Sequence, residues 1–112
     1  MPIPNDYRQI VNLLYQKTEE GVLQWFETSS TVVVNIDEVL LSIWTGVDEE
    51  TDEPFMAFAM NNKGEHKPID SWYLDQSDDD FDLSANLYRS AKRNAKGVPT
   101  LLKKLAERIS AM

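Results

Sequence analysis

The first segment of the chain has apolar residues at the spacing of an amphipathic helix. They lie three or four positions apart and therefore share one helical face: Tyr7, Ile10, Val11, Leu14 and Tyr15. Asp6 and Gln9 form a capping-box pattern at the start of this helix. Gly21 can adopt the left-handed conformation that ends a helix, so the pattern predicts a helix that begins at Asp6 and stops before Gly21.

From residue 22 to residue 74 the helical period gives way to short apolar and β-branched runs separated by polar turns. Four or five of these runs predict strands: Val22–Thr28, Thr31–Ile36, Val39–Trp44, Phe55–Met60 and Ile69–Leu74. The run Phe55–Met60 is apolar throughout, which favours a central strand with little water on either face. Gly46–Pro54 is predicted as a polar loop. Because short turns join consecutive strands, we expect antiparallel neighbours in a meander sheet.

Helical spacing returns in the last third of the chain. Apolar residues four positions apart predict a helix from about Asp82 to Lys96, which Gly97 ends. Pro99 suits the first turn of a further helix. The apolar face of this further helix consists of Leu101, Leu102, Leu105, Ile109 and Met112.

The order of elements predicts an α+β fold with an N-terminal helix, an antiparallel meander sheet of four to five strands, and two C-terminal helices packed on the sheet. A length of 112 residues, of which 42% are apolar and 27% charged, suits one domain that spans residues 1–112. The sequence shows neither a signal peptide nor an apolar run long enough to cross a bilayer. We therefore expect a cytoplasmic protein with no membrane partner.

Charge is distributed unevenly along the chain, whose net charge is −8. Residues 1–82 carry four basic and eighteen acidic side chains, whereas residues 83–112 carry seven basic side chains and one acidic one. Four of the seven cations follow the spacing i, i+3, i+4 and i+7, so they share one helical face, opposite the apolar one. The predicted interaction stripe consists of these four and of three cations on the next helix: Arg89, Lys92, Arg93, Lys96, Lys103, Lys104 and Arg108.

Three interpretations of this basic stripe stay open. It can be a solvated helix face that pairs in part with the acidic majority of the chain. It can be an interaction surface for an acidic protein, or for the acidic loops of a second copy in a homodimer. It can also contact the phosphates of a nucleic acid. The acidic residues 1–82 would repel a polyanion, and no aromatic residues are interleaved with the stripe for base stacking, so nucleic acid is the less favoured partner.

Motifs that carry catalysis are absent from the sequence. Its four glycines lie far apart, which excludes a phosphate-binding P-loop and a dinucleotide fingerprint, and it has no cysteine. His66 is the only histidine. Asp78, Asp80 and Asp82 match the start of a calcium-binding loop, but the glycine and glutamate that such a loop needs next are missing. We therefore predict no catalytic residue, no metal site and no cofactor.

Aromatic residues concentrate in the predicted strands, where all three tryptophans lie: Trp25, Trp44 and Trp72. Most of these aromatic residues suit a core. Helices at the two ends of the chain can nevertheless leave one face of the sheet open, while several strands are apolar on both faces. An uncovered apolar face would form the contact with a partner or with a second copy.

Two segments of the chain carry recognisable patterns. Residues 13–25 contain K-T-x-x-G-x-x-x-W, and residues 87–98 contain L-Y-x-x-A-x-R. With the strands between them, these segments resemble a group of small uncharacterised bacterial α+β proteins, often from prophage or mobile-element settings. The resemblance spans most of the chain. It implies a bacterial origin and a shared fold, and it implies no activity, ligand or catalytic residue.

No definite function follows from the sequence. Our first hypothesis is a non-enzymatic protein-interaction module, of a regulatory, immunity-type or chaperone-like kind, that binds another protein or itself. It rests on the missing catalytic motifs, the polarised charge and the expected apolar face. The alternatives are a nucleic-acid-associated protein that uses the basic C-terminal helix, and an enzyme that relies on carboxylates and a supplied metal.

Overall fold

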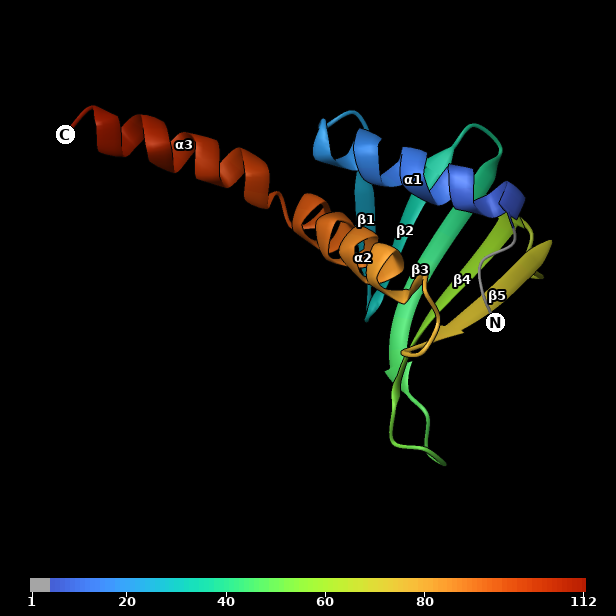
Figure 1. The fold of residues 1–112 in the computed structure, drawn as a ribbon. Helices are drawn as coiled ribbons and strands as arrows, with labels where there is room; N and C mark the ends of the chain where they lie inside the picture. The colour runs from blue at the N-terminus through green and yellow to red at the C-terminus, as the bar shows by residue number, and fades with distance from the viewer. Residues whose placement is uncertain (1–4) are drawn as a thin grey trace.

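The computed structural model describes the backbone of residues 5–112 and the side chains of residues 7–112. Its elements in chain order are α1 (Asn5–Glu19), β1 (Trp25–Thr28), β2 (Thr31–Ile36), β3 (Val39–Val47), β4 (Pro54–Asn62), β5 (Asp70–Asp75), α2 (Phe81–Ala95) and α3 (Val98–Ser110). An N-terminal helix, a five-stranded antiparallel sheet and two C-terminal helices confirm the predicted α+β fold (Figure 1). The capping box predicted at Asp6 lies outside the described side chains.

α1 ends before Gly21 in a Schellman motif, as the glycine predicts. Gly21 has a φ of +77°, and its N–H donates to the carbonyl of Thr18 at 3.1 Å. The N–H of Val22 donates to the carbonyl of Lys17 at 3.0 Å. These two bonds satisfy carbonyls at the end of the helix and turn the chain toward β1.

β1 begins at Trp25 rather than at Val22, and the reason is a side chain of α2. The amide of Asn94 donates to the carbonyl of Leu23 at 2.8 Å and accepts from the N–H of Trp25 at 2.7 Å. The backbone just before β1 therefore finds its hydrogen bonds on a helix instead of on a neighbouring strand.

The sheet is a meander with the strand order β1-β2-β3-β4-β5, in which all neighbours are antiparallel. β2 has the predicted bounds, whereas β3 and β4 extend to Val47 and Pro54, so the loop between them is shorter than predicted. Gly46, predicted in that loop, lies in β3 opposite Phe55. A Cβ atom at Gly46 would lie 2.6 Å from the Phe55 ring, so glycine allows this ring to lie over the strand.

The core lies between one face of the sheet and the layer formed by α1 and α2 (Figure 1). The pairing register sends alternate residues of each strand to this face. The row Val32, Ile43, Phe58 and Trp72, for example, runs across four strands, and every member is buried. The buried cluster comprises Val11, Leu14, Trp25, Val32, Val34, Ile43, Met56, Phe58, Trp72, Leu74, Leu87, Tyr88 and Ala91.

Two buried tryptophans hold the two ends of α1 on the sheet. Near its start, Trp72 stacks between Tyr7 and Phe58, and its ring centre lies 4.3 Å and 5.0 Å from theirs. Near its end, the indole N–H of Trp25 donates to the hydroxyl of Thr18 at 2.9 Å. The helix is therefore fixed by directional contacts as well as by its apolar stripe.

The prediction that both C-terminal helices pack on the sheet holds for α2 and not for α3. α3 runs away from the sheet (Figure 1), which gives the molecule extents of 52 × 34 × 26 Å. None of the residues Val98–Ser110 is buried. The physical reason is the joint: α2 ends beside the edge strand β1, and Gly97 (φ +72°) connects it to α3 without a loop that could bring α3 back over the sheet.

Candidate interaction surfaces

The basic stripe predicted on α2 is partly neutralised by the fold. The ammonium of Lys92 lies 3.7 Å from a carboxylate oxygen of Glu27 on β1 and 5.4 Å from the centre of the Tyr88 ring. Arg89 is exposed and donates to the side chain of Asn86 one turn earlier. Lys92 therefore stabilises the contact between α2 and β1, and its charge acts less strongly on an outside anion.

Arg93 and Lys96 lie at the end of α2, where it meets α3. Both are exposed and line a polar pocket of about 440 Å³. Glu19 of α1 and Thr100 of α3 line the same pocket. Because Glu19 brings a carboxylate to this place, the pocket has mixed charge rather than the uniform positive charge that the sequence pattern indicates.

The other three predicted cations lie on α3, and all three are exposed. At 100° per residue, Lys104 and Arg108 lie on one side of the helix, while Lys103 points away from the apolar residues. The seven predicted residues thus belong to two helices that run in different directions (Figure 1). Their role in binding stays a prediction.

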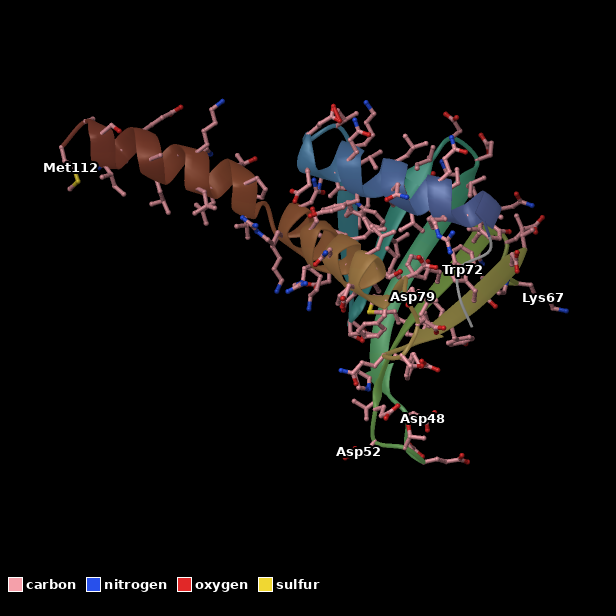
Figure 2. The ribbon with its side chains drawn as sticks, viewed as in Figure 1. Asp48, Asp52, Lys67, Trp72, Asp79 and Met112 are labelled. Carbon is pink, nitrogen blue, oxygen red and sulfur yellow. The ribbon has the colours of Figure 1, made fainter. Side chains whose placement is uncertain are left out.

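α3 carries an apolar stripe that no other part of the described chain buries. Four of its side chains lie on the helix within a sector of about 100°, and the fifth, Met112, follows the helix end. Each is about half exposed or more, from 48% for Leu105 to 95% for Met112, which lies at the tip farthest from the sheet (Figure 2). Lys104 and Arg108 flank one edge of this sector. The α3 apolar stripe comprises Leu101, Leu102, Leu105, Ile109 and Met112.

The face of the sheet opposite α1 and α2 is also uncovered (Figure 1). At its centre, the Tyr73 ring lies 6.3 Å from the Trp44 ring and 6.1 Å from the Phe55 ring. Ala57, between Trp44 and Tyr73 in the register, is fully buried by its larger neighbours. Tyr73 itself is 55% exposed, and Phe26 on the edge strand is 59% exposed. The expected uncovered apolar face is therefore present, and what binds to it stays a prediction.

An apolar groove of about 430 Å³ opens on the helix-covered face of the sheet, beside α1. One wall is α1, with Ile10 and Leu14, and the other is the turn between β2 and β3, which follows Ile36. Asp37 and Glu38 in this turn are exposed and place two carboxylates at the rim. We call this feature the α1 groove. Its floor consists of Leu41, Ile43, Phe58, Met60 and Trp72.

Sequence reasoning does not find the α1 groove. Its two walls come from segments around residues 10 and 38, which only the packing of α1 on the sheet brings together. In the sequence, Asp37 and Glu38 simply mark a turn. The α3 apolar stripe, by contrast, follows from local helical spacing alone.

The acidic loop before α2 serves the fold. Asp80 is buried and forms a salt bridge with Arg8 of α1, with N and O atoms 2.9 Å apart. This hydrogen bond and the charge of Asp80 raise the pKa of Arg8 above its ordinary value. α2 begins at Phe81, one residue before the predicted start, and Asp80 stands at its N-cap position. The loop thus connects the start of α2 to α1.

Within the described residues, three or more histidine, aspartate or glutamate side chains nowhere gather closely enough to hold a metal ion. His66 lies exposed in the connection between β4 and β5. Among the helices of residues 5–112, none combines the length and apolar character needed to cross a membrane.

Comparison of the chain with known protein families, curated proteins and solved structures finds no match. The resemblance to small bacterial proteins stays a prediction. A functional conclusion therefore has to come from the surfaces described above.

Proposed function

We propose that the protein is a non-enzymatic protein-interaction module and that α3 is the element it presents to a partner. The main support is the α3 apolar stripe, which has four large side chains on a helix without one buried residue and a fifth, Met112, just after its end. Helices of soluble proteins normally bury such a stripe against a core. α3 therefore has the properties of a helix that another molecule covers.

The energetics favour a covered state of α3. Fully burying one apolar side chain of this size contributes about 1.5–3 kcal/mol. Five side chains that are half exposed or more therefore offer several kcal/mol on docking, part of which offsets the entropic cost of association. A helix of 13 residues is also marginally stable in water by itself, so docking stabilises its backbone as well.

The flanking charges define the chemistry of the partner. Lys104 and Arg108 lie along one edge of the stripe, so the complementary surface is an apolar groove with carboxylates on its rim. The pairing of Lys92 with Glu27 weakens the alternative of a nucleic-acid partner on α2.

A photo-crosslinking amino acid on α3 tests the proposal inside the native host. The probe is placed at Leu105 in the stripe, or at Ser110 on the opposite side of the same helix as a matched control. We expect irradiation to give covalent protein adducts of defined mass from position 105, and about tenfold less from position 110.

Two results would contradict the proposed function. The first is an absence of intermolecular adducts from position 105. The second is an equal and diffuse set of adducts from both positions, which is the pattern of a solvated helix without a partner.

A further inference from the structure

We propose that the α3 apolar stripe of one copy docks in the α1 groove of a second copy, so that two chains exchange helices in a symmetric dimer. This inference rests on the proposed function of α3 and names the same chain as its partner. Four observations support it: the apolar fit, the charges at the rim, the direction of α3 and the closure of the assembly.

The α1 groove has the apolar surface that the α3 stripe requires. Its floor is the core side of β3, β4 and β5, and its walls keep apolar side chains partly exposed, with Ile10 at 42% and Ile36 at 36%. A helix in this groove would lie next to α1 on the sheet. It would become the third member of the helical layer that covers this face.

The charges at the rim of the groove complement those beside the stripe. Asp37 and Glu38 are exposed at one edge of the groove. Lys104 and Arg108 are one turn apart on the same side of α3, next to its apolar sector. Exposed pairs of this kind contribute little affinity, but they select the orientation of the docked helix and make association sensitive to salt.

The direction of α3 identifies the groove of another copy as the docking site. None of the described residues that line the groove belongs to α2, and α1 forms the wall on that side. α2 and the turn between β2 and β3 lie on opposite sides of α1 (Figure 1). To reach the groove of its own chain, α3 would have to cross α1 from a joint of two residues, Lys96 and Gly97. A second copy meets no such obstacle.

A reciprocal exchange closes the assembly at two copies. Each chain donates one helix and accepts one, which is the self-complementary pattern of a twofold dimer. Stable interfaces commonly bury about 1,600 Å² in total. A symmetric pair supplies the helix-in-groove contact twice, so each contact has to provide only about half of that area.

Mixed disulfides test the contact directly, because the chain has no cysteine of its own. An Ile36→Cys variant is mixed with an affinity-tagged Leu105→Cys variant and oxidised gently. We expect a mixed disulfide about tenfold more abundant than from a mixture of Val47→Cys with Leu105→Cys. Val47 is 57% exposed and lies at the end of β3 far from the groove, so it is a matched control.

A charge exchange tests the orientation without disturbing the core. The groove variant carries Asp37→Lys and Glu38→Lys, and the helix variant carries Lys104→Glu and Arg108→Glu. Each variant alone places like charges at both contacts, so we expect about tenfold weaker self-association by sedimentation velocity. In the 1:1 mixture every contact again joins opposite charges, and we expect dimer formation to return. All four positions are exposed, so circular dichroism should show unchanged folding.

The outcomes separate this inference from the proposed function. A monomer at all concentrations whose position 105 still crosslinks to another protein overturns the dimer and leaves the interaction module standing. An intramolecular disulfide in an Ile36→Cys/Leu105→Cys double variant also overturns the dimer, because α3 then occupies its own groove. A dimer that dissociates on Trp44→Ala but not on Leu105→Glu places the contact on the other sheet face and overturns it too.

Discussion

α1 and α3 are amphipathic helices of similar length, yet only α1 has most of its apolar stripe covered within this chain. In α1, Val11 and Leu14 are 1% and 6% exposed, whereas Leu105 in α3 is 48% exposed. The helical spacing of apolar residues does not distinguish the two. What distinguishes them is the set of directional contacts, since Tyr7 and Thr18 join α1 to buried tryptophans. The periodicity of the sequence predicts an apolar face, whereas directional contacts determine which part of the molecule covers it.

The largest expected effect is a difference in stability between matched leucine substitutions in the two helices. Leu14→Ala removes a buried side chain and leaves a cavity, so it should lower the free energy of unfolding by about 2–5 kcal/mol. Leu105→Ala removes an exposed side chain and should change this free energy by less than about 0.5 kcal/mol. Urea denaturation measures both, at a protein concentration too low for self-association.

A large loss of stability from Leu105→Ala under these conditions would break the comparison, because α3 would then be packed within its own chain. If the loss of apparent stability caused by Leu105→Ala grows with protein concentration, the comparison is strengthened. Linkage between folding and association makes the apparent stability of a dimer rise with concentration, and only Leu105→Ala should reduce this rise strongly.

Local patterns predict most of the fold because most of the elements are locally encoded. The β-branched run Thr31–Ile36 forms a strand with the predicted bounds, and Gly21 ends α1 as its left-handed conformation allows. The predicted element bounds are wrong where a residue distant in the sequence determines the local structure. Asn94 delays the start of β1, and the Phe55 ring holds Gly46 in a strand although glycine and its polar neighbours indicate a loop.

The candidate interaction surfaces are predictable only in part, because distant residues also shape them. The apolar and basic positions of α3 follow from their spacing. That Lys92 is partly neutralised follows only from its distance to Glu27, which lies 65 positions earlier in the chain. The α1 groove, with Asp37 and Glu38 at its rim, has no local signal because its walls belong to separate segments. A surface that the packing of distant segments creates can be recognised only in the structure.

A smaller effect is expected from Asn94, the attachment between α2 and β1 that lies closest to α3. Asn94→Ala removes the donor and the acceptor that serve the backbone of Leu23 and Trp25. Because these backbone groups are partly buried, the loss should cost about 1–3 kcal/mol in urea denaturation. Asn86→Ala on the same helix, where the side chain accepts a hydrogen bond from the exposed Arg89, is the matched control and should be close to neutral. Equal effects of the two substitutions would mean that α2, like α3, depends little on directional contacts.

The smallest expected change in stability concerns the loop before α2. Its Asp80 forms the salt bridge with Arg8 that helps to hold α1 in place. The hydroxyl and the N–H of Ser77 donate to the carboxylate of Asp75, which lowers the pKa of Asp75 below its ordinary value of 3.8. A lowered pKa stabilises the folded state above pH 3.8, and this contribution fades as the pH falls through the folded pKa. Ser77→Ala should therefore raise the pKa of Asp75 in an NMR titration. It should also lower the melting temperature slightly at neutral pH, and the two proteins should converge in acid. A difference that persists unchanged below the folded pKa would show that Ser77 acts through loop conformation and not through the charge of Asp75.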